Sequence, residues 1–240
     1  MKIILSGYGK MGRAIEQAAV TRQHEIVARL DAAEDWTMIT SLDDKPDVVM
    51  EFSTPMTAVE NIRRTFDLGL PIVAGTTGWL EHEETVRKWC SDEKQALFTA
   101  SNFSIGVNIL FDLTKRLSSL LEHFDDFDVS IEEIHHIQKL DRPSGTAVTL
   151  ARMIIDKWKR KEKWVNRETD KAEELEIISK RVADVFGIHT IRCASESDRL
   201  TLTHEALNRQ GFAKGALLAA EWLKGKTGYF GMNDMLCLDR

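Results

Sequence analysis

Short apolar runs alternate with amphipathic segments over the first hundred residues. The apolar runs are typical of strands and lie at residues 2–5, 25–30, 47–52, 71–74 and 96–100. Between them, apolar side chains recur at helical spacing, which predicts helices after residue 10, over 56–68 and over 80–90. Strands separated by helices of this length favour right-handed crossovers and a parallel sheet that is covered on both faces. We therefore predict an α/β fold with a Rossmann-like doubly wound parallel sheet.

The hydrophobic pattern changes after about residue 103. Helical spacing predicts helices over 107–121, 144–159 and 212–223, and strict alternation of apolar and polar positions over 127–136 is typical of an antiparallel or open sheet. Further strands are predicted at 176–185, 189–194 and 199–203, and the charge-dense stretch 157–176 is predicted to be a solvated surface segment. We predict that an α+β domain of residues 104–212 is inserted into a first domain made of residues 1–103 and 213–240.

A glycine-rich turn joins the first predicted strand to the first predicted helix. It has the spacing G-x-G-x-x-G and consists of Gly7, Tyr8, Gly9, Lys10, Met11 and Gly12. In this context the first glycine allows a tight turn, the second lets the backbone approach a pyrophosphate, and the third lets the helix pack closely. The helix N-terminus also offers free N–H groups to phosphates. The turn therefore predicts a dinucleotide-binding first domain, and the alternative is a structural turn without a ligand.

Asp31 ends the second predicted strand, nineteen residues after Gly12. A carboxylate at this position accepts a hydrogen bond from a ribose hydroxyl of NAD and repels the 2′-phosphate of NADP. The next residues, Ala32 and Ala33, supply no guanidinium, and Arg29 is the only basic residue nearby in the sequence. We predict that NAD(H) is preferred and that NADP(H) is a second possible cofactor.

Two further polar turns follow predicted strands. One consists of Gly75, Thr76, Thr77 and Gly78, and the other continues from Ala100 through Ser101, Asn102, Phe103 and Ser104. Ligands of open α/β sheets bind beyond the carboxyl ends of the strands, so these hydroxyl and amide groups are candidates for binding a nicotinamide ribose or carboxamide. Each segment taken alone is also explained as an ordinary turn.

The composition of the chain limits which binding partners and which cellular compartment are expected. The formal net charge is −6 and no basic block lies near either end, so no nucleic-acid partner is expected. No apolar run reaches the roughly 18–20 residues that are needed to cross a bilayer. The apolar run at the start of the chain is too short, and is followed too soon by polar residues, for a signal peptide. Cys90, Cys193 and Cys237 lie far apart, which predicts reduced and mostly buried thiols in a cytoplasmic protein.

The segment of residues 133–146 carries the most chemistry. The strand alternation places Glu133 and His135 on one face and His136 on the other. An ordinary histidine titrates near neutrality, so His135 suits proton transfer. No metal is expected, because no further ligands follow at a suitable spacing and Lys139 opposes a cation.

The same segment ends in a predicted helix start at Ser144, Gly145 and Thr146. Ser144 suits the N-cap position, and the glycine beside it exposes backbone N–H groups, so the helix start forms a small anion site. With His136 and Lys139 close in the sequence, the segment suits a carboxylate substrate. The alternative is an ordinary capped helix after a polar loop.

These segments together resemble the 4-hydroxy-tetrahydrodipicolinate reductase family, also called dihydrodipicolinate reductase, of lysine and diaminopimelate biosynthesis. The resemblance covers nearly the whole chain in the order of the family: GYGKMG at 7–12, EFSTP at 51–55, GTTG at 75–78, ASNFSIGVN at 100–108, E-x-HH-x-x-K-x-D-x-PSGT at 133–146 and FAKGALLAAEWL at 212–223. The block at 133–146 is the most specific of them.

The resemblance implies hydride transfer from NAD(P)H to a cyclic unsaturated imine dicarboxylate, which gives tetrahydrodipicolinate. By position, His135 matches the proton donor and acceptor of the family and Lys139 its proton-donating lysine. His136, Gly145 and Thr146 match substrate-binding positions. The residues that match the dinucleotide site are Gly7–Gly12, Asp31, Gly75–Thr77 and Ala100–Phe103. The family is usually a homotetramer built through the sheet of the inserted domain.

The chain departs from the pattern of the family in two places. The loop beyond Asp31, over residues 32–46, is abbreviated, and Ile137 and Gln138 stand where many members carry basic residues, which weakens the local positive potential. Two other functions stay open at this point. A non-catalytic NAD(H)-binding redox sensor would explain the glycine turn but not residues 133–146, and a different amino-acid-pathway dehydrogenase would not explain the PSGT helix start.

Overall fold

The computed structural model describes residues 1–32, 35–37, 39, 45–208 and 210–238. The chain divides into two compact units, which are described separately. Unit 1 consists of Met1–Ile105 with Gln210–Arg240, and unit 2 of Gly106–Arg209. None of the helices in the described ranges is long and apolar enough to span a bilayer.

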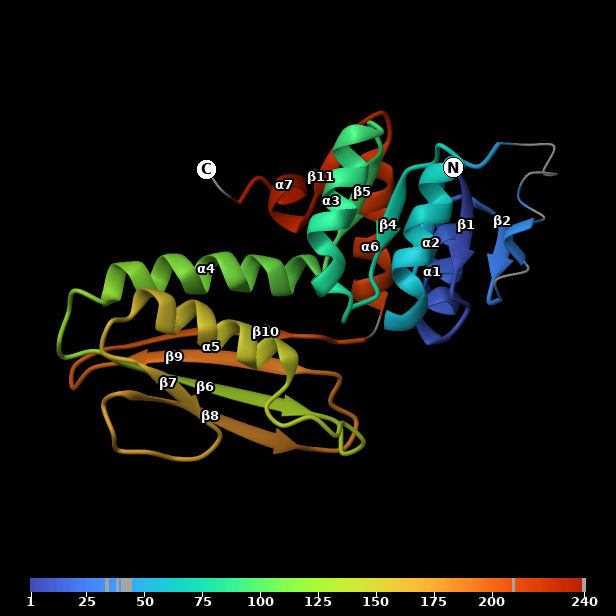
Figure 1. Ribbon diagram of the computed structural model, residues 1–240. Coiled ribbons are helices and arrows are strands. Elements are labelled where there is room, and N and C mark those ends of the chain that lie inside the picture. Colours follow the sequence, from blue (N-terminus) through green and yellow to red (C-terminus); the bar gives the residue numbers. More distant parts are fainter. Residues whose placement is uncertain (33–34, 38, 40–44, 209, 239–240) are drawn as a thin grey trace. The chain divides into compact units, whose positions relative to one another are not determined.

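Unit 1 is built on a parallel sheet of six strands (Figure 1). The strand order is β11-β5-β4-β3-β1-β2, and every neighbouring pair is parallel. The strands are β1 (Lys2–Ser6), β2 (Glu25–Leu30), β3 (Val48–Glu51), β4 (Ile72–Ala74), β5 (Ala96–Thr99) and β11 (Gly228–Phe230). Sequence order and sheet order reverse between β1 and β3, so this is the switch point where open α/β sheets bind ligands at the carboxyl edge.

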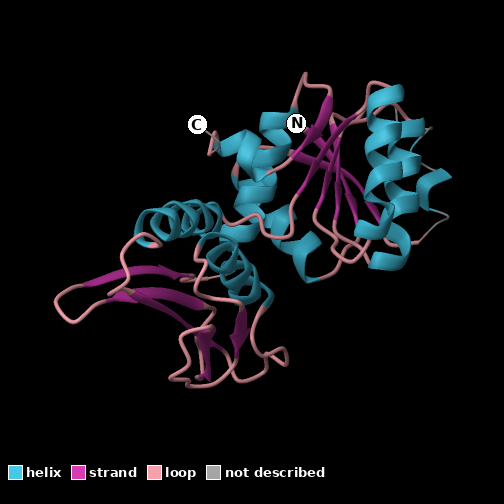
Figure 2. Cartoon of the chain, turned by 60° about the vertical axis from the view of Figure 1, so that its left-hand side comes forward, coloured by secondary structure: helices cyan, strands magenta, loops and turns pink. Residues whose placement is uncertain are grey.

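Helices cover both faces of this sheet, as Figure 2 shows. They are α1 (Lys10–Thr21), α2 (Pro55–Asp67), the 3₁₀ turn η2 (Leu80–His82), α3 (Glu83–Asp92), α6 (Gln210–Leu223) and α7 (Met232–Leu236). One apolar core lies between the sheet and the pair α1 and α6, and a second lies on the α2 and α3 face. The central strands β3 and β4 are buried on both faces, and apart from Glu51 their residues are all apolar. The predicted α/β doubly wound fold is confirmed.

Unit 2 is a mixed five-stranded sheet with helices on one face. The strand order is β10-β9-β6-β8-β7, in which β6 pairs antiparallel with β9 and parallel with β8. Its elements are α4 (Ile105–Leu121), β6 (Asp128–His135), α5 (Gly145–Lys157), β7 (Lys163–Val165), β8 (Glu174–Arg181), β9 (Ile188–Ala194) and β10 (Arg199–Glu205). α4 and α5 pack on the apolar face of the sheet, and the predicted inward side of α5 is buried down to Trp158.

Most of residues 157–176 are exposed, as predicted, but the structure corrects the prediction that the whole stretch is a solvated surface segment. This stretch contributes β7 and the start of β8 to the sheet, and Lys161 and Glu174 are buried. The Lys161 ammonium contacts Asp128 Oδ1 at 2.7 Å and donates to the Glu174 carbonyl oxygen at 3.0 Å. Lys163, Arg167 and Lys171 of the same stretch pair with Glu174, whereas the carboxylate partner of Lys161 is Asp128, from a distant segment.

Three other differences concern short or terminal features. β11 and α7 have too few residues for a periodic pattern, and the sequence analysis missed both. The predicted helix over 80–90 begins as the 3₁₀ turn η2 and becomes α-helical at Glu83. Cys90 and Cys193 are buried free thiols, as expected, but Cys237 is exposed in the turn after α7.

Candidate active site

The glycine turn of unit 1 is shaped by close backbone packing. Gly7 has φ of +89°, and a Cβ at this residue would lie 2.4 Å from the Phe52 carbonyl oxygen. A Cβ at Gly12 would lie 2.4 Å from the Gly7 carbonyl oxygen. Neither position accepts a side chain, so both glycines are required for the chain to turn between β1 and α1.

Gly9 differs from its two neighbouring glycines because the space above it is open. A Cβ on Gly9 would meet no heavy atom within 4 Å. Gly9 is the N-cap of α1, and no side chain caps this helix end. The first N–H groups of α1 are therefore available to an anion, and the turn fits the pyrophosphate of a dinucleotide.

Asp31 lies beside the glycine turn, directly after β2. Its Oδ1 accepts a hydrogen bond from the Tyr8 backbone N–H at 2.6 Å, and its own backbone N–H donates to Asp35 Oδ2 at 2.8 Å. The second interaction, with a similar one from Ala32, lowers the pKa of Asp35. Asp31 is exposed and follows the last residue of β2, at the carboxyl edge of the sheet. Ala33 lies outside the described residues.

Two arginines lie on the Tyr8 ring beside Asp31. The guanidinium carbons of Arg13 and Arg29 are each 5.5 Å from the ring centroid. Arg29 also pairs with Glu16, which accepts from the Tyr8 hydroxyl. The sequence analysis named Arg29 and missed Arg13, whose position one residue after Gly12 gives it no proximity to Asp31 along the chain. Arg13 reaches the Tyr8 ring from the first turn of α1, and the Tyr8 backbone in turn meets Asp31.

A small pocket of about 260 Å³ lies at the carboxyl edge of β3 and β4. Its lining contains Met11, Phe52, Ser53, Pro55, Gly75, Thr76 and Thr77. Gly75 is required here, because a Cβ would lie 2.0 Å from the Phe52 ring. Thr76 Oγ1 is buried and has no hydrogen-bond partner within the described residues. The sequence analysis missed Phe52 and Ser53, which the resemblance placed only in the EFSTP block.

The turn after β5 lies next to this edge. The Ala100 N–H donates to the Ala74 carbonyl oxygen at 3.4 Å, and Asn102 Oδ1 accepts from the Ser104 N–H at 2.9 Å. The Phe103 ring is buried 5.6 Å from the Phe52 ring. Ser101 is exposed. Of these four predicted cofactor positions, Phe103 is a core residue and the other three lie at or near the surface.

In unit 2, the buried face of strand β6 is apolar at first and becomes polar toward the C-terminal end of the strand. Val129, Ile131, Glu133 and His135 alternate on the buried face, as the sequence pattern predicted. The sheet register places Glu133 opposite His189 on β9 and His135 beside Arg181 on β8. We call Glu133, His135, Ser144, Arg181 and His189 the Glu133 cluster. The sequence showed Glu133 and His135, but Arg181 and His189 enter only through strand pairing.

Glu133 is fully buried at the centre of the Glu133 cluster. Its Oε1 accepts from Arg181 Nη2 at 3.3 Å, and both oxygens accept from the Ser144 N–H at 3.1 Å. Burial opposes ionisation, but the Ser144 hydrogen bonds hold the pKa of the carboxyl below its ordinary value. Glu133 is therefore a buried carboxylate at neutral pH.

The two buried histidines of the Glu133 cluster are neutral at pH 7. Burial lowers the pKa of His135, against the opposing effect of Glu133, and burial lowers the pKa of His189 to about 3. His135 Nδ1 lies 3.4 Å from Glu133 Oε2. The rings of His135 and His189 meet edge to face with centroids 5.0 Å apart.

Lys139 lies in the loop after β6, and Arg181 holds this loop. The Lys139 ammonium contacts Asp141 Oδ1 at 2.8 Å. Arg181 donates to the backbone carbonyl oxygens of Lys139 at 3.3 Å and Asp141 at 2.6 Å. The guanidinium of Arg181 therefore connects the buried carboxylate of Glu133 to the loop that carries the lysine.

The N-terminus of α5 lies beside the Glu133 cluster. Ser144 is the N-cap, as predicted, and its Oγ accepts from the Ala147 N–H at 3.2 Å. A Cβ on Gly145 would meet nothing within 4 Å, and the Gly145 backbone donates to the Asp141 carboxylate, so this helix start already holds a negatively charged group. The Ser144 Oγ also lies 3.2 Å from His189 Nε2.

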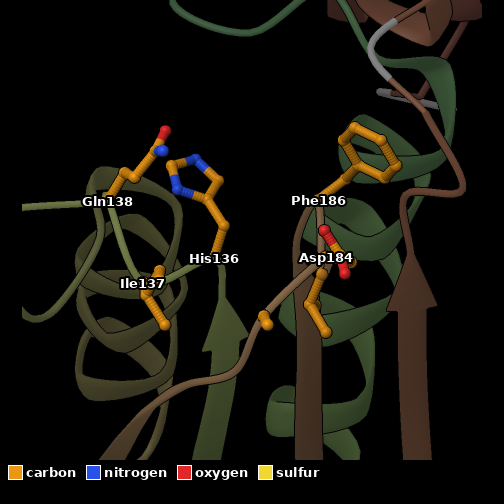
Figure 3. Close-up of a pocket in the computed structure, with 7 residues that line it drawn as sticks. His136, Ile137, Gln138, Asp184 and Phe186 are labelled. Atoms are coloured by element: carbon orange, nitrogen blue, oxygen red, sulfur yellow. The ribbon is translucent and has the colours of Figure 1, made fainter.

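His136 follows the last residue of β6 and lines a pocket of about 290 Å³ (Figure 3). In Figure 3 His136 and Gln138 project from the loop after β6, and Asp184 and Phe186 project from the β8–β9 loop on the other side of the opening. His136 Nδ1 is buried and has no hydrogen-bond partner within the described residues.

Glu133, His135 and His189 also place three possible metal-ligand atoms within 4.8 Å of one another. The Glu133 carboxylate is already engaged by the Arg181 guanidinium and the Ser144 N–H. A cation added here would lie against an existing positive charge, so the donor set favours an ion pair over a metal.

Two family models match the chain. The model "Dihydrodipicolinate reductase, N-terminus" matches residues 1–103, and "Dihydrodipicolinate reductase, C-terminus" matches residues 106–236. The two matches together cover most of the chain.

Individual proteins give the same result. The chain is 45% identical over 236 residues to a 4-hydroxy-tetrahydrodipicolinate reductase of Christiangramia forsetii, covering 98% of each chain. It is 36% identical over 239 residues to the 4-hydroxy-tetrahydrodipicolinate reductase of Rickettsia bellii, covering 98% of this chain and 94% of that one. A dipicolinate-bound dihydrodipicolinate reductase from Paenisporosarcina sp. TG-14 has the same fold, with a TM-score of 0.78 at 24% identity, covering 98% of this chain and 99% of that chain.

Proposed function

The chain belongs to the dihydrodipicolinate reductase family, as the resemblance predicted, and from this membership we propose that it reduces 4-hydroxy-tetrahydrodipicolinate to tetrahydrodipicolinate with NAD(P)H. The observation that carries the proposal is the set of groups around the end of β6. A histidine, a lysine and a helix N-terminus lie in one short segment, where a dicarboxylate and a proton donor are both required. Neither the redox sensor nor a different dehydrogenase is favoured by the relatives.

We propose that residues of unit 2 bind the substrate and supply protons. The N–H groups of Gly145 and Thr146, with the Thr146 hydroxyl, bind one carboxylate of the substrate, and His136 contacts the substrate. Lys139 attracts the dicarboxylate and helps water to leave the hydroxylated ring. His135 exchanges a proton with the ring as the negative charge left by reduction is quenched, a step that positioned general acids accelerate roughly 10²–10⁴-fold.

The dinucleotide is assigned to unit 1. When bound, the nicotinamide supplies the hydride. The N–H groups at Gly9, Lys10 and Met11 face the pyrophosphate, while Gly7 and Gly12 shape the turn, Tyr8 lies beside it and Asp31 accepts from the adenosine ribose. The remaining assigned contacts are Gly75, Thr76, Thr77, Ala100, Ser101, Asn102 and Phe103. Because the exposed Asp31 carboxylate repels a 2′-phosphate, NADH is preferred, and the nearby Arg13 and Arg29 leave NADPH as a second cofactor.

We also propose a role for each domain, an oligomeric state and a cellular compartment. Residues 1–103 with 213–240 are the dinucleotide-binding domain, and residues 104–212 are the substrate-binding and tetramerisation domain. The protein works as a homotetramer in the cytoplasm, with no nucleic-acid or membrane partner. Light scattering of the purified protein tests the tetramer, and a dimer or monomer at micromolar concentration would contradict it.

A coupled assay tests the reaction. The substrate is generated freshly by the aldol-condensing synthase that precedes this step, and NADH oxidation is followed with and without that synthase. Oxidation that depends on the synthase product supports the proposal. NADH binding without turnover would support the sensor, and oxidation with an unrelated amino-acid-derived substrate would support another dehydrogenase.

A further inference from the structure

The buried carboxylate of Glu133 lies where it controls the orientation of His135. Of the two carboxylate oxygens, Oε1 is occupied by Arg181 Nη1 and Nη2, at 3.4 and 3.3 Å. Oε2 accepts from the Ser144 N–H at 3.1 Å and lies 3.4 Å from His135 Nδ1, which is buried and has no hydrogen-bond partner within the described residues. A buried ring nitrogen that faces a carboxylate is favoured in its protonated state, because the N–H then points at the negative charge.

The other ring nitrogen of His135 lies next to a glycine. A Cβ at Gly187 would lie 3.2 Å from His135 Nε2, so the glycine leaves room beside this nitrogen that another residue would take. With the proton held on Nδ1, the lone pair of Nε2 is the one that accepts or passes on a proton. The ring therefore has one nitrogen that faces the Glu133 carboxylate and one nitrogen left for chemistry.

The neighbours of Glu133 hold its carboxylate in place beside His135. The Ser144 N–H, at the start of α5, and the Arg181 side chain, 4% exposed, hold the carboxylate from two other elements. His189 Nε2 lies 3.9 Å from Oε2, and its low pKa keeps the ring neutral, so it adds no second positive charge. Its edge packs against the His135 ring and restricts the rotation of that ring.

We propose that Glu133 is a positioning residue that holds His135 in its Nδ1-protonated tautomer, with Arg181 and the Ser144 N–H fixing the carboxylate. Only the expected effect of Glu133 on kcat rests on the proposed function. The tautomer itself is a property of the resting protein.

The direct test is the tautomer of His135 in ¹⁵N-labelled full-length protein, measured by NMR at neutral pH. The wild type is expected to carry its proton on Nδ1, and Glu133→Gln is expected to move the population toward Nε2. A wild-type ring protonated on Nε2, or a Glu133→Gln spectrum that matches the wild type, would overturn the proposal. This readout is valid even if the wild type shows no reductase activity, which separates the two failures.

Kinetics give the second test. Glu133→Gln is expected to lower kcat about 10²-fold while NADH affinity stays unchanged, and to lower kcat very little when His135 is already alanine. Equal losses in both backgrounds would show that Glu133 does not act through His135. Glu132→Gln is the matched control, because it lies on the same strand with its side chain on the other face, where it pairs with Lys180.

A conservative variant covers the case in which Glu133→Gln does not fold. Glu133→Asp keeps the charge for Arg181 and Ser144 but shortens its reach toward His135. It is expected to fold and to give a mixed tautomer population with a kcat between those of the wild type and the glutamine variant. A folded Glu133→Asp with the wild-type tautomer and kcat would count against the proposal.

Discussion

The Tyr8 backbone N–H donates to Asp31 Oδ1 at 2.6 Å, which joins the glycine turn to the end of β2. One oxygen of the carboxylate accepts from the turn, and the residue is exposed beside it. We therefore expect the same side chain to shape the dinucleotide site and to influence the choice of cofactor.

Replacing Asp31 tests that dual role. Asp31→Ala is expected to reduce kcat/KM with NADH about tenfold, since a hydrogen bond to a charged group contributes about 1.5–3 kcal/mol, and to raise the ratio of NADPH to NADH activity. Asp67→Asn is the control, an exposed carboxylate on α2 that pairs with Arg63. A wild type that strongly prefers NADPH would contradict the assignment.

The three glycines of the turn are expected to respond differently to alanine. Gly12→Ala places a Cβ 2.4 Å from the Gly7 carbonyl oxygen and should destabilise unit 1 by about 1–3 kcal/mol, measured by urea unfolding. Gly9→Ala meets no neighbour, so the protein should keep its stability and bind NADH several-fold more weakly, measured by calorimetry. Undiminished NADH affinity in Gly9→Ala would place the pyrophosphate elsewhere.

His135→Ala is expected to lower kcat by roughly 10²–10⁴-fold with little change in NADH affinity, because the imidazole is assigned to proton transfer. His123→Ala removes an exposed histidine after α4 and should leave kcat unchanged. Steady-state kinetics and NADH titration measure the two quantities. An unchanged kcat would remove His135 from the mechanism.

Lys139→Ala is expected to lower kcat and to raise the KM of the dicarboxylate, because the ammonium both attracts the substrate and assists loss of water. Lys157→Ala, which removes an ammonium paired with Asp156 at the end of α5, is the control. A change in kcat with the substrate KM untouched would assign Lys139 to chemistry alone.

The stability of the protein should fall as the pH decreases from 6.5 toward 5, partly because of His189. Burial lowers the pKa of His189 to about 3, so the unfolded chain binds a proton in this range that the folded protein does not bind. This contribution to the free energy of unfolding is full above the unfolded pKa, near 6.5, and is lost by about 1.4 kcal/mol per pH unit below it. The charged and titratable groups around His189 belong to two strands, β6 and β10, and to the loop after β6: Glu133, His135, His204 and Lys139.

Urea unfolding at pH 6.5 and pH 5 measures this loss, in a range above the titration of most carboxylates. His189→Gln should reduce the difference between the two pH values, and His82→Gln, an exposed residue near α3, should leave it unchanged. An equal pH dependence in the wild type and His189→Gln would show that the imidazole becomes charged without unfolding.

The alternation and helical spacing of the sequence were enough to predict most helices and strands. The glycine spacing at residues 7–12 and the N-cap at Ser144 are local signals, since they depend on backbone conformations that only particular residues support. The prediction for residues 157–176 holds for the exposed part of the stretch but missed the buried Lys161, because its carboxylate partner Asp128 lies far away in the sequence. β11 was missed because three residues carry no measurable period.

The sequence by itself determined the doubly wound sheet, the glycine turn, the shared face of Glu133 and His135, and the family, because each of these is written in spacing along one segment. Only the tertiary structure decided which groups meet Glu133: Arg181 and His189 reach it through the pairing of β6 with β8 and β9. It also brought Arg13 to Tyr8 beside Asp31. Strand register and helix packing join residues that no periodic pattern relates, so the electrostatic surroundings of a side chain are set by the fold.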